Sequence, residues 1–188
     1  MPDFDFAASV RWARFDPGRT LARRPDEELP FLGDKGSAGR ELLLDTCVYI
    51  DGLQGRAPDR VADLLDIRLS NHSSIAVQEL MHTVDVLDPN HPSTGTAVGQ
   101  IRRVIEAMPS HRIFVPDIDV LGRAALLSGM LCRLQGYQRD ARLRALHDCV
   151  LFLQAQKLGL TILTANVSDF DYLLQLIPAG RALFYRAV

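Results

Sequence analysis

The sequence has few cysteines. Its 188 residues include only three, and no two of them form a close pair of the CxxC type. Structural zinc sites need paired ligands and disulfide frameworks need an even set of cysteines, so neither is predicted. We interpret Cys47, Cys132 and Cys149 as reduced side chains inside a cytosolic protein.

Long apolar runs are also missing. No stretch of the sequence approaches the ~18 consecutive apolar residues that a membrane-spanning helix needs. The segment MPDFDFAASV at the N-terminus carries acids early and has no apolar centre of the secretory type. We therefore expect a cytoplasmic protein that does not associate with membranes.

The sequence has neither an excess of charge nor a nucleotide-binding motif. Its net charge is −2, so binding of a polyanion would depend on a local cluster of basic residues. Neither a GxGxxG fingerprint nor a P-loop occurs, which leaves nucleotide-cofactor functions without support. The length and the apolar content of 47% are typical of one globular domain.

Residues 1–40 differ from the rest of the chain. They hold seven basic and seven acidic residues, interrupted by glycine and proline, and show no helical or strand period. The segment LPFLGDKG within them can pack as an extended flap. We interpret residues 1–40 as an N-terminal arm that is at best partly ordered, and residues 41–188 as the folded domain.

The pattern after residue 41 alternates between strands and helices. Apolar segments predict strands at residues 42–45, 66–70, 112–115, 160–164 and 183–185. Helices are predicted at 48–53, 59–65, 75–87, 94–108, 120–134, 142–158 and 170–176. Ser73 or Ser74 can cap the third helix, whereas Gly136 and Gly159 end the two long ones. Strands separated by helices need crossover connections, so we predict an α/β fold with a mostly parallel sheet covered on both faces.

Four acids stand where an isolated charge would be costly. Asp45 directly follows the buried run LLL, and Asp169 follows the strand at 160–164 in the segment TANVSDFD, together with Asn166. Glu79 and Asp148 lie inside largely apolar helices. Sites of parallel sheets lie beyond the carboxyl ends of the strands, so two strand ends deliver acids to one edge. A shared divalent cation would offset the charge of all four, and Mg²⁺ or Mn²⁺ suits oxygen ligands.

Each acid taken alone also has a simpler interpretation. Asp45 and Asp169 can be helix caps, because an aspartate at a helix start satisfies free amides of the first turn. Glu79 can belong to a solvated helix face. Asp148 can pair with its neighbour His147 or with an arginine of the same helix, Arg142 or Arg144.

Three blocks of the sequence resemble a known family. LLLDTCVYID, SSIAVQEL and HDCVLFLQAQKLGLTILTANVSDF resemble the PIN domain family, and within it the VapC-type ribonuclease toxins of bacterial toxin–antitoxin pairs. The resemblance covers residues 42–188 and implies a three-layer α/β/α fold. It further implies a homodimer that cleaves RNA with Mg²⁺ or Mn²⁺ and is held inactive by an antitoxin protein.

The resemblance assigns roles to individual residues. Asp45, Glu79 and Asp148 match the acids that hold the metal and carry catalysis, and Thr164 matches the threonine that closes the following strand. Many members have an acid where this chain has Asn166, an amide that can ligate through its oxygen but adds no charge. Either Asn166 or Asp169 can be the fourth ligand, and Asp169 is the candidate acid, as both catalytic residue and metal ligand. The implied reaction is metal-assisted hydrolysis of a phosphodiester bond. A second departure from the family is the arm, because typical toxins begin almost at the first strand.

Basic residues gather around Gly136 and form the candidate RNA-binding surface. Contacts of this kind to phosphates would give an affinity that depends on salt and little on sequence. The same residues can equally form an ordinary solvated helix surface. Tyr137 can stack on a base or can simply lie at the surface. The candidates nearest the predicted site are Arg133, Arg139, Arg142 and Arg144.

Other functional classes are judged by single positions. A phosphoaspartate phosphatase needs a second aspartate two residues after Asp45, where this chain has Cys47. Two alternatives stay open at this point. One is a PIN-like module that binds protein or RNA without turnover, and the other is a nuclease that acts on DNA.

Overall fold

The computed structural model of the chain describes residues 4–33 and 38–188. Its centre is a five-stranded sheet in the order β3-β2-β1-β4-β5, in which every pair of neighbouring strands is parallel. The strands are β1 (Leu42–Leu44), β2 (Ser70–Ser73), β3 (Ile113–Phe114), β4 (Thr161–Thr164) and β5 (Ala182–Phe184). The predicted α/β fold with a parallel sheet is confirmed.

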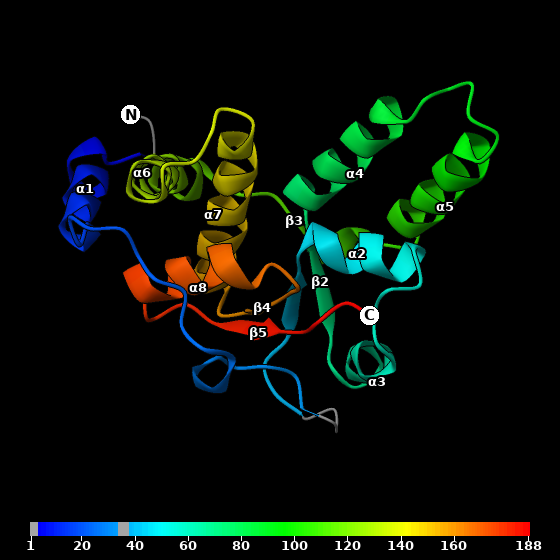
Figure 1. Cartoon of the computed structure of the whole chain (residues 1–188), viewed down its shortest axis with the longest axis horizontal. Coiled ribbons are helices and arrows are strands. Elements are labelled where there is room, and N and C mark those ends of the chain that lie inside the picture. Colours follow the sequence, from blue (N-terminus) through cyan, green and yellow to red (C-terminus); the bar gives the residue numbers. More distant parts are fainter. Residues whose placement is uncertain (1–3, 34–37) are drawn as a thin grey trace.

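Helices cover both faces of the sheet (Figure 1). They are α2 (Thr46–Leu53), α3 (Asp59–Ile67), α4 (Ser74–Val86), α5 (Thr94–Glu106), α6 (Ile118–Gln135), α7 (Ala141–Leu158) and α8 (Val167–Leu176). Leu43 of β1 packs in one hydrophobic core with α6, α7 and α8, whereas its neighbours Leu42 and Leu44 pack in a second core with α2 to α5. Successive strand residues point to opposite faces, so this alternation produces the predicted three-layer α/β/α arrangement.

Most predicted elements lie where the sequence placed them, but β2 does not. The strand predicted at 66–70 is wrong, because α3 continues to Ile67 and the strand runs over Ser70–Ser73. The predicted cap is confirmed, since the Ser73 hydroxyl accepts a hydrogen bond of 3.2 Å from the amide of Ile75. Gly136 ends α6 and Gly159 ends α7 with φ values of 65° and 72°, in the left-handed region that favours glycine.

Residues 4–33 of the predicted arm pack against the domain. They form α1 (Phe6–Val10) and the 3₁₀ turns η1 (Arg11–Phe15) and η2 (Asp26–Glu28), and α1 lies beside α6 (Figure 1). The expected flap runs along β5, where the Leu32 amide donates to the Phe184 carbonyl at 2.7 Å and the Phe184 amide to the Pro30 carbonyl at 2.9 Å. Residues 1–3 and 34–37 of the predicted arm lie outside the described residues, and its status as a separate unit stays a prediction.

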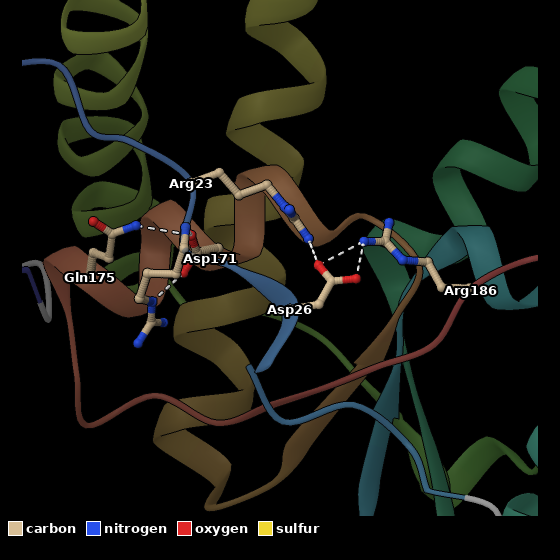
Figure 2. Close-up of polar contacts among 6 residues, drawn as sticks. Arg23, Asp26, Asp171, Gln175 and Arg186 are labelled. Carbon is tan, nitrogen blue, oxygen red and sulfur yellow. Dashed lines mark hydrogen bonds and ion pairs between the residues drawn. The ribbon is translucent and has the colours of Figure 1, made fainter. Parts of the chain in front are cut away.

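A buried ion pair fastens the arm to α8, and we call Arg24 and Asp171 the arm clamp. Asp171 is completely buried, and its carboxylate accepts hydrogen bonds from the Arg24 amide at 2.8 Å and from the Arg24 Nε at 2.6 Å. Gln175 donates to the same carboxylate at 2.9 Å. Figure 2 shows a second, exposed group of ion pairs nearby, with Asp26 between Arg23 and Arg186. The sequence pattern missed the clamp because its two residues are far apart in the chain.

None of the helices in the described ranges is long and apolar enough to span a membrane.

Gly180 provides the first testable prediction, which concerns packing. A Cβ atom at this position would lie 2.1 Å from Cζ of Phe152, a core side chain that is 1% exposed. We expect Gly180→Ala to lower the free energy of unfolding by about 1–3 kcal/mol, since the ring must shift within a packed core. Thermal unfolding followed by circular dichroism measures this. Gly129→Ala, where nothing lies within 4 Å of the added atom, is the control and should not lower the melting temperature. An unchanged melting temperature for Gly180→Ala would contradict the packing described.

Candidate active site

All four predicted acids line one cavity at the carboxyl ends of β1 and β4. The cavity has a volume of about 400 Å³. It receives Asp45 from the end of β1, Glu79 from α4, Asp148 from α7 and Asp169 from α8. Its complete lining is Asp45, Thr46, Cys47, Glu79, Tyr137, Ala141, Arg144, Asp148, Asn166 and Asp169. The topology therefore brings together residues that are up to 124 positions apart in the sequence (169 − 45).

Asp45 does not act as a helix cap, although it occupies the N-cap position of α2. Its side chain forms no capping hydrogen bond. The carboxylate instead accepts a bond of 2.6 Å from the Thr164 hydroxyl and one of 3.0 Å from the Cys47 thiol. Burial raises the pKa of Asp45, and the Glu79 carboxylate adds to this, whereas the two hydrogen bonds oppose it. The carboxylate is thus held in the cavity at an electrostatic cost.

Asp148 is buried and has no cationic hydrogen-bond partner among the described residues. It is 8% exposed, and none of His147, Arg142 and Arg144 pairs with it among the described residues. Its hydrogen-bond partner among the described residues is Asn166, whose Nδ2 donates to it at 3.1 Å. Burial is the largest of the causes that raise the pKa of Asp148 well above its usual range, and the Asp45, Asp169 and Glu79 carboxylates add to it. The Arg144 charge nearby acts in the opposite direction and lowers the pKa.

Asn166, not Asp169, caps α8. The helix begins at Val167, three residues before the predicted start, and the Asn166 side chain accepts a bond of 3.4 Å from the Asp169 amide. The Nδ2 of Asn166 donates to Asp148 at 3.1 Å and to Asp169 at 2.9 Å, so one amide links two carboxylates. The hydroxyl of Tyr137 donates to the other oxygen of Asp169. The Asp169 side chain is therefore not used as a helix cap and faces the cavity as its fourth acid.

Glu79 is bound from two sides by residues that the sequence analysis did not assign to the site. The Thr46 hydroxyl donates to one carboxylate oxygen, and His147 Nδ1 lies 2.8 Å from the other. Cys47 also lines the cavity, and its sulfur accepts a bond of 3.2 Å from the Ala165 amide. Thr46 and Cys47 had a signal in the sequence, because both directly follow the acid at a strand end. The contact of His147 with Glu79 depends on the packing of α4 against α7, so no local sequence pattern indicated it.

The donor chemistry fits a divalent cation, although the side chains as they lie are not gathered around a point. Among the described residues, no three His, Cys, Asp or Glu side chains are close enough together to hold a metal ion. Neutral hydrogen-bond donors contact the carboxylates instead: the Asn166 amide bridges Asp148 and Asp169, the Thr46 hydroxyl donates to Glu79, and the Tyr137 hydroxyl donates to Asp169. Four carboxylates and one amide oxygen are nevertheless the ligand types that Mg²⁺ and Mn²⁺ prefer. Ligation would need the carboxylates to move closer together.

The predicted basic surface is only partly directed at the cavity. Arg144 lines it. Arg142 donates to the Tyr137 carbonyl at 3.3 Å, and Arg133 forms an ion pair with Asp16 of the arm. These two line a separate cavity of about 480 Å³ between α6 and α7, whereas Arg139 is exposed. Of the four candidates, Arg144 is thus the one placed to contact a group inside the acidic cavity.

The sheet order, the two helical layers and the acidic cavity define a PIN-like α/β/α domain. No family model matches the sequence, and no curated protein matches it. Solved structures do match. The FitAcB structure from Neisseria gonorrhoeae shares 22% identity at a TM-score of 0.55, covering 77% of this chain and 96% of that chain. VapBC2 from Rickettsia felis, bound to a DNA fragment from its promoter, shares 13% identity at a TM-score of 0.53. The match covers 77% of this chain and 98% of that chain. DNA-bound VapBC from Salmonella typhimurium shares 16% identity at a TM-score of 0.52. The match covers 77% of this chain and 97% of that chain. At these identities the likeness shows the fold, and the resemblance to VapC-type PIN domains is confirmed at that level.

Proposed function

We propose that this protein is a metal-dependent endoribonuclease and the toxin of a toxin–antitoxin pair. The observation that carries the proposal is the convergence of four acids from β1, α4, α7 and α8 on one cavity. Two of them, Asp45 and Asp148, are buried and have a raised pKa. The toxin role is supported by the structural neighbours, which are toxin–antitoxin complexes of the FitAB and VapBC type.

In this proposal the residues of the cavity have three different roles: metal binding, positioning of a ligand, and contact with RNA. Asp45, Glu79, Asp148 and Asp169 would hold one or two ions of Mg²⁺ or Mn²⁺. When bound, such an ion would activate a water molecule near neutral pH and would offset charge on the phosphate. Thr164 and Cys47 orient the carboxylate of Asp45 through their hydrogen bonds. Arg144 at the wall of the cavity would contact a phosphate of the RNA.

The partners follow from the same proposal. An antitoxin protein would bind the chain and block its cavity, and two copies of the chain would form a homodimer in the cytoplasm. FitAcB and VapBC, as complexes of two different proteins, support the first of these points.

One observation favours a second candidate, a PIN-like binding module without turnover. The described carboxylates are not grouped tightly enough to hold a metal ion as they lie, and Asn166 contributes no charge. A module of this kind would bind RNA or protein and would leave RNA intact.

The test is cleavage of a mixed RNA pool by the purified full chain. We expect cutting with Mg²⁺ or Mn²⁺, and a loss of about 10²–10³-fold with a chelator, because the four carboxylates alone cannot activate water. Single-stranded DNA of matched length runs beside the RNA, and Asp45→Asn purified in the same way controls for contaminating nucleases. Cutting of DNA alone would make the protein a DNA nuclease. Absence of any cutting by the folded, partner-free chain would favour the binding module.

A further inference from the structure

Tyr137 is the one aromatic side chain that lines the acidic cavity, within the part of the chain that the structure describes. It lies in the loop between α6 and α7, and its backbone is fixed at both ends. Its amide donates to the Cys132 carbonyl at 3.1 Å, directly after the left-handed turn at Gly136. Its carbonyl accepts from Arg142 at 3.3 Å, and its ring packs half-buried against the core. The phenol is therefore held in place before any substrate arrives.

The hydroxyl of this tyrosine fixes one of the four acids. It donates to Oδ1 of Asp169, while the Asn166 amide donates to Oδ2 of the same carboxylate at 2.9 Å. Both oxygens of Asp169 are thus held, from different elements of the fold. The same Asn166 amide also reaches Asp148 at 3.1 Å, so the fixed carboxylate lies next to the buried one.

Asp169 needs such support more than the buried acids do. It is half-buried, whereas Asp45 and Asp148 are 6% and 8% exposed and have little room to turn. A partly exposed aspartate side chain rotates between several conformers, and the cost of fixing one of them weakens any ligand it holds. A hydrogen bond from a rigid donor removes part of that cost in advance.

We propose that Tyr137 is a positioning residue that keeps Asp169 turned into the cavity beside Asp148, so that fewer side-chain conformers are lost when the carboxylates close on a divalent cation. The inference rests on the proposed metal-dependent function, because it concerns the same cavity. Loss of a hydrogen bond to a ligand of this kind weakens metal affinity by about 10–100-fold. The alternative role, stacking of the ring on an RNA base, makes the opposite prediction, since it needs the ring and not the hydroxyl.

Tyr137→Phe removes the hydroxyl and keeps the ring. We expect calorimetric titration of the full chain with Mn²⁺ to give an affinity about 10–100-fold weaker than that of the wild type. RNA cleavage should need higher Mn²⁺ by the same factor, recover at saturating Mn²⁺, and show an unchanged KM for RNA. The melting temperature without metal should stay the same, which a merely structural role of the hydroxyl would not predict.

Tyr172→Phe is the matched control. Tyr172 is another half-buried tyrosine, on α8, and its hydroxyl forms no hydrogen bond with the described residues. Its loss should change neither Mn²⁺ affinity nor cleavage. Equal Mn²⁺ affinity of wild type and Tyr137→Phe would overturn the proposal, and so would a wild type that binds no Mn²⁺. A wild type that binds Mn²⁺ but cuts no RNA would refute the nuclease alone, because the difference in affinity would still be measured.

Discussion

Asp148→Asn is expected to abolish RNA cleavage and, at the same time, to make the metal-free protein more stable. Asp148 is buried and near three other carboxylates, and these causes raise its pKa well above its usual range. An asparagine keeps the shape and can still accept the bond from Asn166, but it carries no charge that must be removed from water. We expect the free energy of unfolding to rise by about 1–3 kcal/mol, or ~2–4 °C in melting temperature per kcal/mol. Cleavage should fall by about 10²–10³-fold.

The pH dependence of stability gives the same prediction an independent readout. The folded state of the wild type binds the Asp148 proton more tightly than the unfolded state, where the pKa has its ordinary value of 3.8. The stabilisation from this proton is therefore complete below the unfolded pKa and is lost as pH rises through the raised folded pKa. Metal-free wild type should therefore lose stability as pH rises above the unfolded value of 3.8. Asp148→Asn should lose less stability over the same pH range, because one of the two buried carboxyl groups is gone. The loss that remains comes from Asp45, whose pKa is also raised by burial.

Melting curves at several pH values in chelator, with cleavage assays of the same preparations, check both halves of this prediction. Asp63→Asn is the control, since this aspartate is exposed on α3, away from the cavity. It should leave cleavage and stability unchanged. Cleavage retained by Asp148→Asn would remove this residue from the active site, and an unaltered melting temperature would contradict the strain inferred from its burial.

The arm clamp should be the largest contributor to stability among the ion pairs of the arm. Asp171 is completely buried, and Arg24 is its cationic partner. Removing one partner of a buried pair costs about 3–5 kcal/mol, because the other charge stays buried and unpaired. The Arg24 side chain is 34% exposed, so water can partly replace it. We expect Arg24→Ala to lower the free energy of unfolding by about 2–3 kcal/mol, at or just below the lower limit of that range.

The preceding residue offers a matched control. Arg23 is similarly exposed, at 31%, but it pairs with Asp26, which is 44% exposed and keeps its second partner Arg186. Arg23→Ala should cost no more than about 0.5 kcal/mol, as exposed ion pairs contribute little. Figure 2 shows the two arrangements close to each other.

The sequence supplies a direct probe of the arm in this experiment. Trp12 is the single tryptophan and lies in η1, where it contacts Phe15 and the Arg123 guanidinium of α6. In Arg24→Ala its fluorescence should shift toward that of a solvated indole at a lower temperature than in the wild type. Adding Asp171→Asn to Arg24→Ala should restore part of the stability. Equal effects of Arg23→Ala and Arg24→Ala would refute the clamp.

The positions of the acids could be predicted because they depend on local patterns. A buried run such as Leu42–Leu44 predicts a strand, and parallel strands bring their carboxyl ends to one edge. Asp45 and Asp169 therefore converge without any knowledge of distant contacts. The role of Asn166 as the cap of α8 was missed, because an acid three residues later satisfies the same local pattern.

The strand β2 was misplaced for a different reason. Ser70–Ser73 is a central strand with the sequence SNHS, which has no apolar signal. Its buried polar side chains are satisfied by tertiary contacts, such as the bond of 3.0 Å from Asn71 to the Leu42 carbonyl and that of 2.7 Å between His72 and the Tyr49 hydroxyl. The arm shows the same limit, since its pairs join residues from opposite ends of the chain.

The clamp also has a consequence for the order in which the protein is completed during synthesis. The arm is translated before Asp171, Phe184 and Arg186, the residues to which it binds. Asp169, the final acid of the cavity, lies on the same turn of α8 as Asp171. A nascent chain therefore acquires the fourth acid of the cavity and the buried partner of the arm within three residues of each other. Before that point the arm can contact α6, through pairs such as Arg133 with Asp16, but it lacks its buried partner on α8, and the cavity lacks one of its four acids.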